Sequence, residues 1–224
     1  MQTTLKLLLE NVYFSEGPRW HNNKFWFSDF YQHAVFSVDA NGVLEKIVDI
    51  PNQPSGLGWL PNGDMLIVSM HDQKLMRFSD GVLSLHSDLS HLTKFTCNDM
   101  VVDNDGHAYI GNFGTTQHNI DVKPTCLIHV TPDGKASIVA ENLEFPNGTV
   151  ITPDGKKLIV GETYIFRRLN DQTSHPFFVT DDINGGMPSS KITLKAISSG
   201  NSYPWPSSSN GAAGLVEMEV TIND

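Results

Sequence analysis

The sequence is poor in basic residues and has no basic cluster. Fifteen Lys and Arg residues stand against twenty-five Asp and Glu residues, which gives a formal net charge of −10, and no run of basic residues is longer than a pair. Proteins that bind nucleic acid need a basic surface to neutralise phosphates. The composition therefore argues against nucleic acid as a partner.

Cysteines and long apolar runs are also scarce. Cys97 and Cys126 are the two cysteines, and neither lies in a CxxC pair. We expect two reduced thiols, as in a cytosolic protein, in preference to a disulfide. The apolar run near the start is interrupted at Glu10, so it is too short for a signal peptide, and no stretch approaches a membrane span. These features predict a cytoplasmic protein with no membrane partner.

Several catalytic motifs are missing. The nine histidines form no HExxH spacing, which argues against a zinc hydrolase of that kind. There is no GxSxG motif of a serine hydrolase. The pair Gly56-Leu-Gly58 lacks the third glycine and the surrounding elements of a dinucleotide-binding motif.

The sequence does contain an internal repeat. Four stretches start with a polar residue and continue with mostly apolar residues, a turn rich in Asn-Gly or Asp-Gly, and a short apolar strand. Their first residues, separated by 39, 43 and 49 positions, are Glu16, Ser55, Asn98 and Asn147. A period of about 40 to 50 residues is typical of propeller blades of four strands. If the blades are radial, these four residues converge on one axis.

The strand pattern predicts an all-β β-propeller with about three and a half recognisable blades, and therefore an incomplete one. Each copy predicts an inner hairpin, because the Asn-Gly and Asp-Gly turns favour positive φ. In three copies an outer hairpin follows, over residues 34–50, 74–89 and 126–143, whereas the fourth copy shows only its inner pair. We interpret residues 5–14 as a closing strand.

Two regions follow from where the pattern ends. Residues 1–165 are predicted to form the partial propeller, and residues 166–224 a divergent tail rich in Ser, Gly and Pro that is partly disordered. Only residues 176–180, 192–197 and 215–222 of this tail are apolar enough for strands.

The unpaired blade edges predict self-association. The insertion between Phe113 and Thr125 is either a lid over the channel or an ordinary solvated loop.

Residues 1–164 resemble the senescence-marker-protein/gluconolactonase family, which includes regucalcin and luciferin-regenerating enzyme. The resemblance depends on four strings in this order: EGPRW, PSGLGWLPNGDMLIVS, CNDMVVDNDGHAYIGNFG and FPNGTVITPDGKKLIVGET. It implies a six-bladed propeller with a divalent metal, commonly calcium, in its axial channel. It also implies hydrolysis of lactones.

The resemblance assigns the metal to Glu16 of the EGP motif and Asn147 of the PNG motif. Asn98 of the ND motif contacts the metal, its water or the substrate in the family, so we predict it as metal ligand and substrate-binding residue. Oxygen donors of this kind favour Ca²⁺, with Mg²⁺, Mn²⁺ or Zn²⁺ as alternatives. The competing interpretations are an exposed acid for Glu16, a turn residue for Asn147 and an Asx turn for Asn98. Trp20 and Trp59, at equivalent positions, are predicted as blade core.

The first functional hypothesis is a metal-dependent hydrolase of a small lactone, such as a sugar lactone. The family's last ligand, an Asp that also serves as the supposed base, has no counterpart after Ile165, so the catalytic residue is not assigned. Thr96 stands where the sugar lactonases carry an Arg. The second hypothesis is therefore a truncated or inactive relative that acts as a non-catalytic binding or interaction module. A third is a complete small propeller used as a scaffold.

Overall fold

A computed structural model describes residues 8–10, 12–116, 122–167, 174–182, 192–196, 200–203, 213–215 and 218–222. Every regular element in these residues is a β-strand. The chain divides into two units, Met1–Gly185 and Gly186–Asp224. The described residues contain no helix long and apolar enough to cross a membrane.

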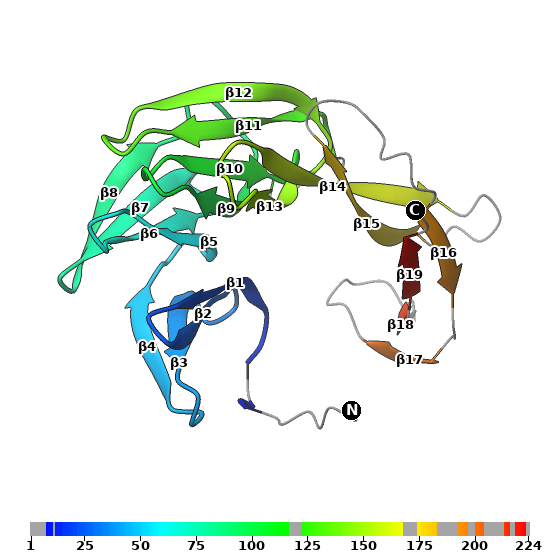
Figure 1. Ribbon diagram of the computed structural model, residues 1–224, viewed down its shortest axis with the longest axis horizontal. Helices are drawn as coiled ribbons and strands as arrows, with labels where there is room; N and C mark the ends of the chain where they lie inside the picture. The colour runs from blue at the N-terminus through cyan, green and yellow to red at the C-terminus, as the bar shows by residue number, and fades with distance from the viewer. Residues whose placement is uncertain are drawn as a thin grey trace. The chain divides into compact units, whose positions relative to one another are not determined.

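Three four-stranded antiparallel sheets follow one another along the first unit (Figure 1), and we call them blades 1 to 3. Blade 1 is formed by β1 (Ser15–His21), β2 (Lys24–Asp29), β3 (Ala34–Val38) and β4 (Leu44–Asp49). Blade 2 is formed by β5 (Pro54–Trp59), β6 (Met65–Ser69), β7 (Lys74–Ser79) and β8 (Val82–Asp88). Blade 3 is formed by β9 (Cys97–Val102), β10 (Ala108–Asn112), β11 (Thr125–Val130) and β12 (Ala136–Leu143). The predicted inner and outer hairpins are confirmed in all three.

Blade 4 has one strand more than the sequence pattern indicated. It consists of β13 (Asn147–Ile151), β14 (Leu158–Arg167) and β15 (Ser174–Asp182), paired in that order. The inner pair was predicted, and the apolar run at 176–180 was noted as a strand that does not align to the repeat. This run belongs to β15, which pairs with β14. Antiparallel strands can pair through their backbones without the Asn-Gly or Asp-Gly turn that marks each repeat.

The second unit contains two small antiparallel sheets. One pairs β16 (Ile192–Ala196) with β19 (Met218–Ile222), and the other pairs β17 (Gly200–Tyr203) with β18 (Ala213–Leu215). Strands are thus found in all three tail segments predicted to be able to form them, since β15 covers 176–180, whereas β17 lies outside these segments. The division of the chain at residue 165, and disorder of the tail, stay predictions.

The apolar core lies between neighbouring blades. One buried cluster joins blades 2 and 3 and includes Leu66, Met100 and Ile128, and a second joins blades 1 and 2 and includes Val35 and Ile67. Each fully buried side chain of this size stabilises the fold by about 1.5–3 kcal/mol. The blades therefore stabilise one another through the faces that they share.

Both cysteines are free and belong to the cluster between blades 2 and 3. Burial, with smaller contributions from the charges of Cys126 and Asp72, raises the pKa of Cys97 to about 12. The Cys97 thiol is therefore protonated at neutral pH, and thiolate chemistry at this position is not favoured.

The prediction of a closing strand at residues 5–14 is wrong for the part that the structure describes, because residues 8–10 and 12–14 are not strand. Their backbone groups have other partners. The amide of Tyr13 donates to Asp29 Oδ2 at 2.9 Å, and Phe14 accepts from the amide of Phe30 at 3.0 Å. Leu9 packs on a cluster of blade 1. Residues 5–7 lie outside the described residues.

The insertion after β10 is fixed at both ends by Asn112, which is fully buried. Its Oδ1 accepts from the amide of Gly114 at 3.2 Å and from the Thr125 hydroxyl, and its Nδ2 donates to the carbonyl of Cys126 at 2.8 Å. The amide of Lys123 closes the base of the insertion by donating to Gly114 O at 2.8 Å. Residues 117–121 lie outside the described residues, so the lid interpretation stays a prediction.

Candidate functional site

The first strands of the blades, β1, β5, β9 and β13, lie next to one another. β1 contacts β5 and β9, β5 contacts β9, and β9 contacts β13. The four repeat positions are therefore the first or second residues of neighbouring strands, as the register argument required. We call this group of strands the inner strands.

Glu16 is half-buried on β1 and has no cationic partner among the described residues. Burial raises the pKa of its carboxyl group, and the negative charge of Asp99 raises it further, while a hydrogen bond from the backbone of Gly17 acts in the opposite direction. A partly buried carboxylate next to a second carboxylate is destabilising when it is ionised and unpaired. A cation bound at this position would remove that cost.

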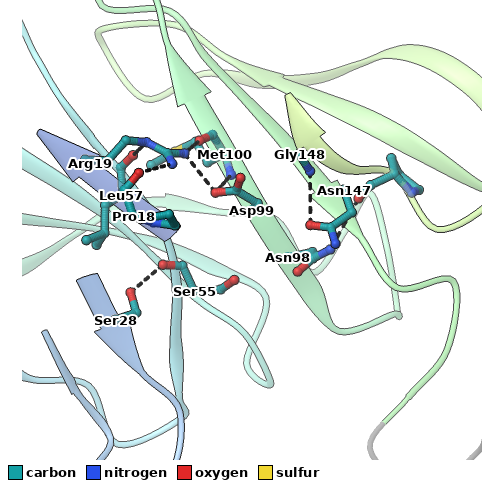
Figure 2. Close-up of polar contacts among 11 residues, drawn as sticks. Pro18, Arg19, Ser28, Ser55, Leu57, Asn98, Asp99, Met100, Asn147 and Gly148 are labelled. Atoms are coloured by element: carbon teal, nitrogen blue, oxygen red, sulfur yellow. Dashed lines mark hydrogen bonds and ion pairs between the residues drawn. The ribbon is translucent and has the colours of Figure 1, made fainter. Parts of the chain in front are cut away.

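Asn98 and Asn147 lie on neighbouring inner strands (Figure 2). Asn98 is 4% exposed, and its Nδ2 donates to the carbonyl of Pro146 at 3.4 Å, directly before Asn147. This contact orients the amide and leaves Oδ1 available as an acceptor. The Oδ1 of Asn147 accepts from the amide of Gly148 at 3.0 Å, and a carbonyl oxygen retains a second lone pair for a further partner.

Asp99 is a second acid close to Glu16. It follows Asn98 on β9, and its charge acts on Glu16 of β1. Ser55, the remaining repeat position, is 1% exposed, and its carbonyl accepts a hydrogen bond from the Ser28 hydroxyl (Figure 2). Its burial agrees with the spacing role expected for a side chain too short to reach a central ion.

Arg19 holds the inner strands of three blades together (Figure 2). Its Nε donates to the carbonyl of Leu57 on β5 at 3.0 Å. Its Nη2 donates to Asp99 Oδ1 on β9 at 2.9 Å and also to the carbonyl of Met100. The Arg19 and Asp99 side chains are 24% and 14% exposed, so this ion pair is largely shielded from water. We call this set of contacts the Arg19 clamp.

Sequence reasoning missed the Arg19 clamp, although a signal for it was present. In the four copies, the position of Arg19 is otherwise Gly58, Val101 or Val150, and the position of Asp99 is otherwise glycine. The first copy thus carries a positive charge at Arg19, and the third copy a negative charge at Asp99, where the other copies have small or apolar residues. Two opposite charges that each occur in a single copy indicate that these two copies are in contact.

The prediction that Trp20 is blade core is wrong. Trp20 is 66% exposed, whereas Trp59, at the equivalent position of β5, is half-buried against the cluster between blades 1 and 2. Trp59 is covered by blade 1. In the described part of the first unit no sheet precedes β1, so nothing equivalent covers Trp20.

The chemistry of the donors fits a hard cation. The site offers one carboxylate and two amide carbonyls, which Ca²⁺ and Mg²⁺ accept readily. Within the described residues, no group of three or more His, Cys, Asp or Glu side chains could hold a metal. A metal held at this site therefore depends on the amide oxygens, which are oriented by the contacts of Asn98 and Asn147.

Replacing Glu16 with Gln is expected to raise the free energy of unfolding of the metal-free chain at pH 7.5. The folded-state pKa of Glu16 is raised above the ordinary value of 4.5, so folding favours the protonated acid. Below the pKa that Glu16 has in the unfolded chain, the acid is protonated in both states and its burial costs no stability. As the pH rises through the higher pKa of the folded chain, ionisation of Glu16 lowers the free energy of unfolding. Urea unfolding in the presence of a chelator should show the gain at pH 7.5 and a smaller gain at pH 4.5.

The matched control for this prediction is Glu45→Gln. Glu45 is exposed and pairs with Lys24 at 2.8 Å, so its neutralisation should lower stability slightly or leave it unchanged. A loss of stability for Glu16→Gln at pH 7.5, or an equal gain at both pH values, would contradict the interpretation of Glu16 as an acid without a partner.

Comparison with known proteins gives one family and several related structures. The model of the SMP-30/Gluconolactonase/LRE-like region matches residues 14–171. Among solved structures, the chain is similar to a gluconolactonase from Xanthomonas campestris, with 20% identity and a TM-score of 0.59 over 75% of this chain and 62% of the other. No curated protein sequence matches significantly.

Two further structures have the same fold. The calcium-binding protein regucalcin from Agrobacterium tumefaciens is 20% identical, with a TM-score of 0.54 over 80% of this chain and 57% of the other. A luciferin-regenerating enzyme is 17% identical, with a TM-score of 0.55 over 66% and 52%. The chain thus spans only about half to three-fifths of the length of these three proteins. Because the family model covers most of the chain with the predicted motifs, the chain belongs to the SMP-30/gluconolactonase/LRE-like family.

Proposed function

We propose that this chain binds a divalent cation, Ca²⁺ in the first instance, through Glu16, Asn98 and Asn147, and that it serves the hydrolysis of a small lactone such as a sugar lactone. The observations that carry the proposal are a half-buried acid without a cationic partner among the described residues and two amides that are oriented by backbone groups, on strands β1, β9 and β13, of which β9 contacts both β1 and β13. Membership of the family supports the choice of reaction. From the sequence we expect this activity in the cytoplasm.

A bound cation would supply Lewis-acid polarisation of the lactone carbonyl and acidify a water molecule. The residues of the chain would do the remaining work. Glu16 would supply the negative charge that retains the cation, and Asn147 would supply a neutral oxygen ligand. Asn98, with its Nδ2 tied to Pro146 O, would present Oδ1 to the cation or to a substrate hydroxyl.

Calcium titration by calorimetry tests the metal site. We expect saturable binding by the wild-type chain, and affinity about tenfold lower or worse, which corresponds to about 1.4 kcal/mol, for Glu16→Gln and for Asn147→Ala. The matched control is Asn41→Ala, which removes an exposed turn amide that bonds only to Asp39. Unchanged calcium affinity in both site variants would refute the assignment.

Lactone turnover tests the enzymatic part separately. With glucono-1,5-lactone as substrate, we expect calcium-dependent hydrolysis that is lost in the double variant Glu16→Gln/Asn147→Ala. Stoichiometric calcium binding without turnover would favour the second candidate, a non-catalytic binding module. The sequence observation behind that candidate is that residues 166–224 contain no recognisable counterpart of the family's last Asp ligand.

A further inference from the structure

A cavity lies between blades 1 and 2, away from Glu16. It has a volume of about 320 Å³ and is lined by the β1–β2 turn, the β5–β6 turn and the end of β7. His21 at the end of β1 and Trp59 at the end of β5 contribute to its wall. A cavity of this size falls at the lower end of the range of small-molecule sites.

This cavity is spatially separate from the candidate metal site. Glu16 pairs with Ser28 near the start of β1, whereas His21 pairs with Lys24 at its end. His21 lies five positions after Glu16 on β1, which corresponds to roughly 15 Å along the strand. A ligand in this cavity is therefore not in contact with the proposed cation at Glu16.

Aromatic rings form one side of the cavity. His21 stacks on Trp59 with a centroid distance of 4.0 Å and an interplanar angle of 11°. Trp26 meets Trp59 edge-on, at 5.4 Å and 74°, and Phe78 adds a fourth ring to the lining. The indole N–H of Trp26 is already used, since it donates to the carbonyl of His21 at 2.9 Å. The facing sides of His21 and Trp59 cover each other, so a ligand would meet the remaining π-surface of this aromatic cluster.

The charges at the rim are negative. Asp64 and Asp80 line the cavity, and the described residues that line it include no Lys or Arg. Arg77 already neutralises Asp64, to which its Nε donates at 2.8 Å. Asp80 is exposed in the β7–β8 turn, and no cation pairs with it in the described part of the chain. Burial lowers the pKa of His21, so its ring is neutral at pH 7.5 and adds no positive charge.

We propose that this cavity is a binding site for a small organic cation of the alkylammonium type. Aromatic faces attract such cations through their quadrupoles, and a carboxylate at the rim adds a charge contact. An anionic ligand would be repelled by Asp80, and no Lys or Arg among the described lining residues would offset that repulsion. A neutral ligand would gain from the apolar side but not from Asp80.

The test uses choline as the cation and 3,3-dimethylbutan-1-ol, which has the same shape without the charge. Calorimetry on the full chain at pH 7.5 should show saturable, weak binding of choline, and affinity about fivefold lower or worse for the neutral alcohol. In proton NMR, the choline methyl resonance should shift upfield on binding, because ring faces shield protons above them.

Two variants assign the binding to this cavity. Trp59→Leu and Asp80→Asn should each weaken choline binding by about threefold or more. The matched controls are Trp20→Leu, at the equivalent repeat position outside the cavity, and Asp49→Asn, an exposed acid on β4; neither should change it. Absence of saturable choline binding to the wild type, equal binding of the neutral alcohol, or equal effects of the control variants would each overturn the proposal.

Discussion

Replacing Gly56 with Ala is expected to lower the free energy of unfolding by about 3 kcal/mol or more, or to prevent folding altogether. A Cβ atom at Gly56 would lie 2.7 Å from the Cβ of Met100 and 2.8 Å from the carbonyl carbon of Asp99, and closer still to the amide nitrogen of Met100. These neighbours are mostly backbone, so no side-chain rotation relieves the overlap. β5 and β9 would have to separate, and the buried cluster between blades 2 and 3 would open.

Equilibrium unfolding in urea, followed by circular dichroism, measures this loss. The control is Gly155→Asn, in a turn where φ is +69° and a Cβ atom meets nothing within 4 Å. Asn tolerates positive φ, so this variant should remain within about 1 kcal/mol of the wild type. A Gly56→Ala chain as stable as Gly155→Asn would show that β5 and β9 do not approach as closely as the structure places them.

Replacing Arg19 with Met is expected to cost about 2–4 kcal/mol of stability. Met keeps most of the apolar stem but removes every donor of the guanidinium. The carbonyls of Leu57 and Met100 lose a partner, and Asp99 becomes a largely buried carboxylate without a cation, held by the amide of Met100. Urea unfolding of the metal-free chain measures the cost.

The control for Arg19→Met is Lys24→Met, which breaks the exposed Lys24–Glu45 pair and should cost at most about 1 kcal/mol. A second measurement separates charge from packing. In Arg19→Met/Asp99→Asn the unpaired charge is absent, so the double variant should be more stable than Arg19→Met alone. Equal losses for Arg19→Met and Lys24→Met would contradict the Arg19 clamp.

The blades were predictable because their signals are local. Alternating apolar residues and Asn-Gly or Asp-Gly turns specify each hairpin within a short stretch of sequence, and the structure has positive φ at such turns, for example at Gly63 and Gly134. The repeat then gave the order of the sheets. The strand β15 was harder to predict, because it pairs with β14 without a repeat turn.

The candidate site was predictable only as a set of residues that share a register. Glu16, Asn98 and Asn147 follow from the alignment of the copies, but the partners that orient them do not. The bond from Asn98 to Pro146 O spans 48 residues, and the pair of Arg19 with Asp99 spans 80. Such contacts depend on how blades pack. The exceptional charges of Arg19 and Asp99 among the aligned copies indicate one of these contacts, but no pattern within a single blade specifies it. The exposure of Trp20 was missed for the same reason.

The fixation of the β10–β11 connection by Asn112 has a consequence for protein engineering. Asn112, Gly114, Lys123 and Thr125 close the base of this connection by hydrogen bonds that do not depend on its length. The entropic cost of a longer connection grows only slowly with its length. We therefore expect this connection to accept a grafted foreign peptide without redesign of the scaffold.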